Sequence, residues 1–404
     1  MPSNIQLVDA VAGALRESWP GTATAAAAPA LEGAAAALAA HALHRLHPAA
    51  WVVVVTCGPN ELEAFHADLL TLAPGHAAPP LLLPPPEAES AGDIELDGAR
   101  LAVARRLREA VSAPAAATLL ATTATALLAP LPEPQAVEQA GRLLRTGSSE
   151  HGFEALVAAL SAAGYAREPE VVAKGQMAVR GGLLDVWPPD APLPVRVDFF
   201  GDTVESLRTF DPASQRSTAS LETAWIPPCD PARLPAAAPV ERLPEGAVFL
   251  WLDHDRIAAM TTAPGAAEPS PAAWDALRAA VARRAPAREI FCGDPPPAGI
   301  PALPLRVAPP PGLAGLADDP DQPDLRTAAR QKLLAGLEAR ARAGERVIIY
   351  LDTAGGLEWL ARDLPPDTAI LLRHGVLSGG CEWPGTKLVL LGQPDIYALR
   401  KRSA

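Results

Sequence analysis

The sequence predicts an α/β protein of several domains, the first of which is built on a doubly wound parallel sheet. A chain of 404 residues is too long for one ordinary domain. The continuous apolar run 51–56 (WVVVVT) lies between two segments of helical period, which is typical of a parallel strand buried on both faces. A second buried run, 346–351 (RVIIYL), predicts another α/β unit near the C-terminus.

The other elements of residues 1–128 fit the same sheet. Asn60 is a suitable N-cap for a helix that continues at helical period to residue 70. Short apolar runs predict strands at 81–83 and 118–122, and a helix is predicted between them at 98–111. Helices that alternate with strands in this way cover both faces of a parallel sheet.

Residues 129–217 are predicted to form a compact α+β domain. Period-2 alternation predicts one strand over 178–186 and a second over 195–199, joined by a proline-rich connection. Gly201-Asp202 predicts a hairpin that leads to a third strand, 204–210. Together these strands make a small antiparallel sheet.

The rest of the chain contains a less regular region and a third domain. Residues 218–320 include a strand signal at 248–252 and end in a linker rich in Pro, Gly and Asp. Residues 321–404 are predicted to form a small α/β domain, with strands at 369–372 and 387–391.

The composition argues against a protein built to coat nucleic acid. The net charge is -12, whereas phosphate binding depends on clustered Lys and Arg. The four cysteines show no Cys-x-x-Cys spacing, so neither a zinc site nor a disulfide framework is indicated. No signal peptide and no run of about 18 apolar residues is present. We therefore expect a soluble, cytoplasmic chain with no membrane partner and no metal site.

Three segments in the second domain carry a resemblance to a known family. They are RGGLLDVWP (180–188), PVRVDFFGDTVESLR (194–208) and FDPASQRS (210–217). In this order they resemble a signature of bacterial nucleotide excision repair, shared by the excision nuclease component UvrB and the transcription-repair coupling factor (Mfd). The Gln-Arg-Ser ending favours the coupling-factor family.

The resemblance implies a domain organisation and a partner. Residues 1–128 correspond to a degenerate helicase lobe, and residues 218–320 return to complete it before a linker. Residues 129–217 correspond to the domain that docks onto UvrA, and residues 321–404 to a small third domain. By matching the family's positions, Arg180, Arg196 and Phe200 are the expected UvrA-contacting residues.

The sequence lacks the phosphate-binding loop of ATP-dependent relatives. A P-loop requires Gly-Lys-Ser/Thr, and none of the four lysines follows a glycine. In residues 19–24, where we expect UvrB to carry this loop, no lysine occurs. We therefore expect a non-catalytic, UvrA-binding module without a cofactor and with weak, non-specific DNA binding at most. A separate or downstream translocase motor and RNA polymerase are further candidate partners.

The alternative is a fragment of an ATP-dependent DNA-repair enzyme whose motor lies in a missing C-terminal part. Other side-chain clusters have simpler interpretations. The histidine triplet on a predicted helix lacks a carboxylate and is more typical of a solvated face than of a metal site. The arginine cluster is interpreted as a solvated face with weak DNA contact as the alternative, and the acidic run as a solvated segment. These clusters are His41, His44 and His47; Arg105, Arg106 and Arg108; and Glu87, Glu89, Asp93, Glu95 and Asp97.

Overall fold

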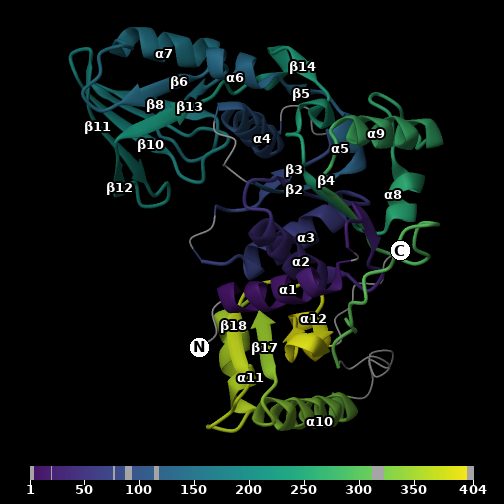
Figure 1. Cartoon of the computed structure of the whole chain (residues 1–404). Helices are drawn as coiled ribbons and strands as arrows, with labels where there is room; N and C mark the ends of the chain where they lie inside the picture. The colour runs from purple at the N-terminus through teal and green to yellow at the C-terminus, as the bar shows by residue number, and fades with distance from the viewer. Residues whose placement is uncertain are drawn as a thin grey trace.

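The computed structural model describes residues 4–19, 21–75, 78–86, 93–112, 118–311 and 323–397. It has a mixed α/β architecture with a parallel sheet, as the sequence predicts. Figure 1 shows this sheet at the centre, a β-rich group beside it, and a small α/β group below it. Most of the predicted linker lies outside the described residues. Within the described ranges no helix has the length and apolar character needed to cross a membrane.

The central sheet has six strands, and all of its pairings are parallel. Two of the strands come from the less regular region after residue 217, so a later segment of the chain completes the first sheet. The strand order is β1 (Ala25–Ala27), β16 (Arg288–Phe291), β15 (Val248–Trp251), β2 (Val52–Thr56), β4 (Leu119–Thr123) and β3 (Leu81–Leu83).

Alternate valines of β2 explain why this strand is an unbroken apolar run in the sequence. Val52 and Val54 belong to the buried cluster on one face of the sheet, whereas Val53 and Val55 belong to the cluster on the other face. One face is covered by α1 (Asn4–Ser18), α2 (Gly33–Leu46) and α3 (Pro59–Leu72). The other is covered by α4 (Ile94–Ser112), α5 (Ala124–Leu128), α6 (Pro134–Ala140), α8 (His254–Met260) and α9 (Pro271–Arg283).

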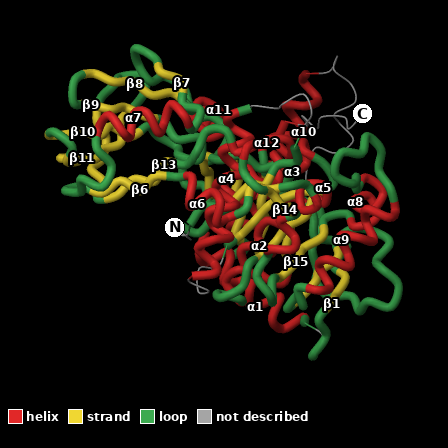
Figure 2. Tube along the Cα trace, turned by 90° about the horizontal axis from the view of Figure 1, so that it is seen from above, coloured by secondary structure: helices red, strands yellow, loops and turns green. Residues whose placement is uncertain are grey.

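The second sheet projects to one side of the central body (Figure 2). Its inner face packs on α7 (Phe153–Ala162) and on a two-stranded ladder of β6 (Arg142–Arg145) and β13 (Thr223–Ile226). A further ladder joins β5 (Leu131–Pro132) to β14 (Ala236–Ala237). The strand order of the second sheet is β12 (Ser217–Leu221), β11 (Thr203–Phe210), β10 (Val195–Phe200), β9 (Leu183–Val186), β8 (Gln176–Arg180) and β7 (Ala166–Arg167).

The prediction of one strand over 178–186 is wrong. The segment forms β8 and β9, which are joined by a turn of Gly181 and Gly182, and Arg180 pairs with Leu183 across it. Gly181 has a φ of +62°, a conformation that favours glycine. Apolar and polar residues alternate through both strands of the hairpin, so this alternation alone does not reveal the turn between them. The Gly-Gly pair was the available signal.

The C-terminal sheet packs against the helices of the central sheet. Its order is β18 (Leu371–His374), β17 (Arg346–Leu351), β20 (Leu388–Leu391) and β19 (Cys381–Trp383), with only β19 antiparallel. One face is covered by α10 (Pro323–Arg342), α11 (Ala354–Arg362) and α12 (Gln393–Tyr397). Side chains on the other face, including Tyr350 and Trp383, belong to the same buried cluster as α1 and α2. Figure 1 shows this sheet directly beneath α1.

The structure also shows that residues 19–24 do not occupy the place of a phosphate-binding loop. Strand β1 begins at Ala25, so residues 19–24 precede the strand and cannot form the turn that follows it. The turn between β1 and α2 is formed by residues 28–32, which read Ala-Pro-Ala-Leu-Glu. This turn also lacks the Gly-Lys-Ser/Thr sequence of a P-loop.

Candidate protein-docking surface

One face of the second sheet carries the three predicted docking residues. Cross-strand partners lie on the same face of an antiparallel sheet, and so do residues two positions apart on one strand. Arg196 pairs with Asp185 on β9, and Asp185 pairs with Ala178 on β8. Arg180 is two positions from Ala178, and Phe200 is four positions from Arg196. All three therefore lie on the outer face, opposite α7.

Phe200 is the most exposed large apolar side chain in the described part of the chain, with 80% of its surface accessible. It precedes the tight turn at Gly201, at the tip of the β10–β11 hairpin. The neighbouring Asp202 accepts a hydrogen bond from the backbone N–H of Phe153, at 3.1 Å, which attaches this tip to the start of α7. A large apolar side chain held exposed at a fixed position is suited to contact with another protein.

Arg180 lies at the same end of the sheet as Phe200. Its side chain is exposed, and its Nη2 donates to the carbonyl of Pro169 at 2.9 Å. The β8–β9 turn that follows it runs beside β10, because the N–H of Phe199 donates to the carbonyl of Gly182 at 2.9 Å. The two hairpin tips are therefore neighbours, and they place a cation and an exposed aromatic ring on one surface.

Arg196 has a different environment from Arg180. Its guanidinium bonds both carboxylate oxygens of Asp185 at 2.8 Å and the carbonyl of Gln215 at 3.1 Å. It also lies over the ring of Phe210, 4.5 Å from the ring centroid. Four strand residues separate it from Phe200, a distance of about 13 Å along β10. Arg180 lies two strands from β10, in the row of Asp198, and is therefore about 12 Å from Phe200. The structure thus places all three residues on one face, with Arg180 and Phe200 at one end of the sheet and Arg196 nearer the other end.

Two aspartates on this face were not identified from the sequence. Asp185 pairs with Arg196, and Asp198 pairs with Arg208 and accepts a hydrogen bond from Ser206 at 2.6 Å. Each aspartate lies directly or diagonally across from its arginine on a neighbouring strand. The opposite charges at alternating positions were visible in the sequence, but only the strand register shows which of them meet.

A family model described as the UvrB interaction domain matches residues 144–230, which include the whole docking surface. The chain contains a UvrB interaction domain. The resemblance identified from the sequence signature is thereby confirmed.

The chain is also similar to curated transcription-repair-coupling factors and to a UvrABC system protein B. A transcription-repair-coupling factor of Mycobacterium tuberculosis is 34% identical over 179 residues, 42% of this chain and 14% of the relative. The Escherichia coli transcription-repair-coupling factor is 43% identical over 75 residues, 19% of this chain and 6% of the relative. UvrABC system protein B of Thermosipho africanus is 30% identical over 79 residues, 20% of this chain and 12% of the relative. The matched segments are thus a small part of each relative.

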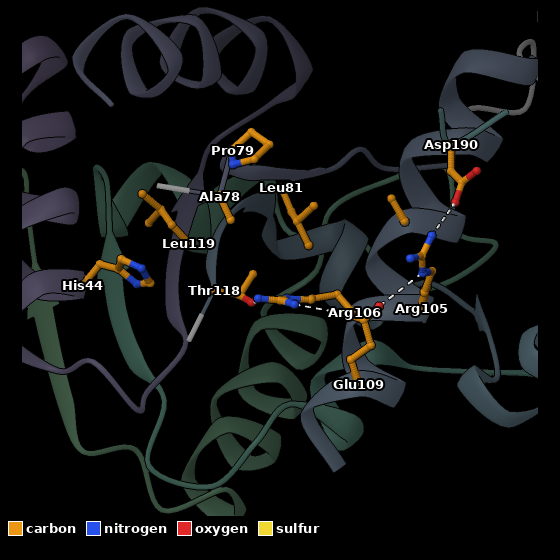
Figure 3. Close-up of a pocket in the computed structure, with 11 residues that line it drawn as sticks. His44, Ala78, Pro79, Leu81, Arg105, Arg106, Glu109, Thr118, Leu119 and Asp190 are labelled. Atoms are coloured by element: carbon orange, nitrogen blue, oxygen red, sulfur yellow. Dashed lines mark hydrogen bonds and ion pairs between the residues drawn. The ribbon is translucent and has the colours of Figure 1, made fainter. Parts of the chain in front are cut away.

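A cavity of about 230 Å³ lies where the UvrB interaction domain meets the central sheet, away from the docking surface. Figure 3 shows Arg105 directed toward Asp190 and Arg106 directed toward Thr118. The cavity has charges of both signs, because Glu109 and Asp190 face the two arginines. It is lined by His44, Ala78, Pro79, Leu81, Ala102, Arg105, Arg106, Glu109, Thr118, Leu119 and Asp190.

The arginine cluster on α4 is partly exposed, as expected for a solvated face, and its members are paired with carboxylates. Arg105 and Arg106 both bond Glu109, at 3.2 and 2.8 Å, and Arg108 bonds Glu138 at 2.6 Å. Carboxylates therefore offset much of the positive charge that a phosphate backbone would require.

The histidines of α2 have separate environments. Burial lowers the pKa of His41 to about 4, and its Nε2 lies 2.8 Å from the carbonyl of Leu69. His44 lines the junction cavity, whereas His47 ends the helix. In the described ranges no group of three or more His, Cys, Asp or Glu is arranged to hold a metal ion.

The acidic run also has local structural roles. Asp93 precedes α4 and accepts hydrogen bonds from the N–H groups of Glu95 and Leu96, at 2.9 and 3.3 Å. Glu95 pairs with Lys174 of the UvrB interaction domain at 2.5 Å. Glu87 and Glu89 lie outside the described residues.

Proposed function

We propose that this chain is a non-catalytic, UvrB-like module that docks onto UvrA during transcription-coupled nucleotide excision repair. The observation that carries the proposal is the presence of exposed Phe200 and exposed Arg180 at the same end of the outer face of the UvrB interaction domain. An exposed ring supplies a buried anchor on binding, and a guanidinium can pair with a carboxylate in two hydrogen bonds. We propose that Arg196 supports this surface through Asp185 and contacts UvrA at its edge.

Binding to the cognate UvrA tests this proposal. Arg180→Ala and Phe200→Ala should each weaken binding about tenfold or more, measured by biolayer interferometry with the full chain. Arg145→Ala is the matched control, because Arg145 is an exposed arginine of the same domain on the inner ladder. Wild-type affinity in both docking variants would remove this surface from the function.

We propose that the central sheet is a degenerate helicase lobe that does not use ATP. The turn after β1 lacks a phosphate-binding lysine. A side chain added at Gly33, the first residue of α2, would lie 3.6 Å from the carbonyl of Gly379 in the C-terminal domain. The C-terminal domain therefore lies beside the helix N-terminus at which a phosphate would bind in a P-loop protein. Calorimetric titration with ATP should give no heat of binding. Micromolar binding would favour the ATP-dependent enzyme instead.

We propose that DNA contact, if a motor or RNA polymerase brings it near, is weak and non-specific. The paired arginines of α4 and the net charge of -12 support this. Fluorescence anisotropy with a short duplex should show binding that disappears between about 50 and 200 mM salt. Tight binding to damaged duplex at physiological salt would contradict it.

A further inference from the structure

A buried carboxylate lies at the junction between the central sheet and the C-terminal domain. Asp68 on α3 has no exposed surface, and its two oxygens accept hydrogen bonds from the N–H and hydroxyl of Ser378, at 2.7 and 2.6 Å. Ser378 lies in the loop 375–380, which connects β18 to β19. The loop is thus attached to α3 through a single acidic side chain and its neighbours.

Other contacts fix the same loop. The hydroxyl of Thr71 donates to the carbonyl of Val376 at 2.7 Å and accepts from its N–H at 3.0 Å. Leu377 is 3% exposed and joins the buried cluster of the central sheet. A Cβ on Gly375 would lie 2.6 Å from Thr71, so the backbone approaches α3 closely at this point. The loop behaves as a strap across α2 and α3.

No ion pair of Asp68 occurs within the described part of the chain. Ionisable groups on the elements packed around it include His41 of α2, Cys381 of β19, Asp395 of α12 and Arg373 of β18, which reaches α3 through Asn4. Burial lowers the pKa of His41 to about 4 and raises that of Cys381 to about 12, so both are neutral near pH 7. The carboxylate of Asp395 accepts hydrogen bonds from the N–H groups of Gly380 and Gly392, both at 2.8 Å.

An ionised carboxylate in this place has lost its hydration, and the two hydrogen bonds from Ser378 compensate for only part of that loss. We propose that the loop 375–380 is a pH-sensitive strap, which holds the C-terminal domain on α2 and α3 while Asp68 is protonated and loosens when Asp68 ionises. This property is independent of UvrA docking, because the strap and the docking surface belong to different domains.

Burial raises the pKa of Asp68 to about 7, and the hydrogen bonds from Ser378 oppose this shift. In the loosened state Asp68 would be hydrated, with a pKa near the ordinary value of about 3.9. The attached state therefore binds more protons between these two values. Attachment is strongest below about pH 4 and weakens as the pH rises through about 7.

Hydrogen exchange of the full chain tests the strap. After correction for intrinsic exchange rates, the protection of the Val376 and Ser378 amides should fall at least about tenfold between about pH 5 and 7. In Asp68→Asn, which keeps the shape but not the charge, this fall should be absent. The amide of Ile349 in β17 is the internal control and should keep its protection. Equal protection at both pH values in the wild type, or the same fall in the variant, would overturn the proposal.

If the Asp68→Asn variant does not fold, a direct titration of Asp68 in the wild-type chain still tests the proposal. Carboxyl carbon NMR of the wild-type chain should show Asp68 titrating near pH 7. A pKa of about 4 for Asp68 would show that burial does not oppose ionisation of the carboxyl group, and would overturn the proposed strap.

Discussion

The guanidinium of Arg196 and the carboxylate of Asp185 form a bidentate ion pair, in which Nε–Oδ1 and Nη2–Oδ2 are both 2.8 Å. The Asp185 side chain is only 2% exposed and that of Arg196 is 14% exposed. The two residues lie opposite each other on β9 and β10. The pair therefore belongs largely to the interior of the domain, although it lies on the face that we propose for docking.

Arg196→Ala should destabilise the UvrB interaction domain by about 3–5 kcal/mol, because it leaves a buried carboxylate unpaired. Urea denaturation followed by circular dichroism measures this loss. Arg145→Ala, at the exposed end of β6, should change the unfolding free energy by no more than about 0.5 kcal/mol. An unfolding midpoint for Arg196→Ala equal to that of the wild type would show that the pair contributes nothing to stability.

Truncation of the two adjacent phenylalanines on β10 should have very different effects on stability. Phe199 is 9% exposed and packs edge-on against Phe153 with ring centroids 5.2 Å apart, so Phe199→Ala should cost about 3–5 kcal/mol of unfolding free energy. Phe200→Ala should change stability by less than about 0.5 kcal/mol, because its ring already meets water. Differential scanning calorimetry of both variants checks this. Equal losses would place both rings in the core.

Gly98 on α4 should tolerate no side chain. A Cβ there would lie 2.0 Å from the carbonyl oxygen of Pro189, in the connection between β9 and β10. Gly98→Ala should therefore lower the thermal midpoint by forcing α4 away from the UvrB interaction domain. Gly336→Ala on α10 is the control, since an added Cβ meets open space and should stabilise the helix by about 0.5–1 kcal/mol. The same sign for both changes would contradict the close packing at Gly98.

Asp68→Asn should remove one source of pH dependence from stability. The raised pKa of Asp68 means that its stabilising contribution is present below about pH 4 and is lost as the pH rises through about 7. The wild-type unfolding free energy, measured relative to that of the Asn variant, should therefore fall between about pH 5 and 8. Urea denaturation at several pH values measures this difference. A constant difference would mean that Asp68 titrates normally.

Local sequence patterns predicted many of the helices, strands and turns, because hydrophobic periodicity and turn-forming residue types depend only on neighbouring positions. The buried strands β2, β15 and β17 follow from short apolar runs, and the turn at Gly201 follows from its Gly-Asp pair. The ordered signature around Arg180 and Arg196 also indicated a UvrB interaction domain. These features needed no knowledge of contacts between distant segments.

Tertiary structure decided how the predicted residues are used. Arg180 and Arg196 looked equivalent in the sequence, but strand register places Asp185 against Arg196 and leaves Arg180 exposed. No local pattern indicated that Asp68 would meet Ser378, because the two are 310 positions apart. Hydrophobic periodicity and turn propensity are set by a few neighbouring residues. Strand pairing and side-chain burial depend instead on which distant surfaces pack together. For that reason the sequence alone indicated the UvrB interaction domain and many of the elements, and the packed structure determined which charges remain available at the surface.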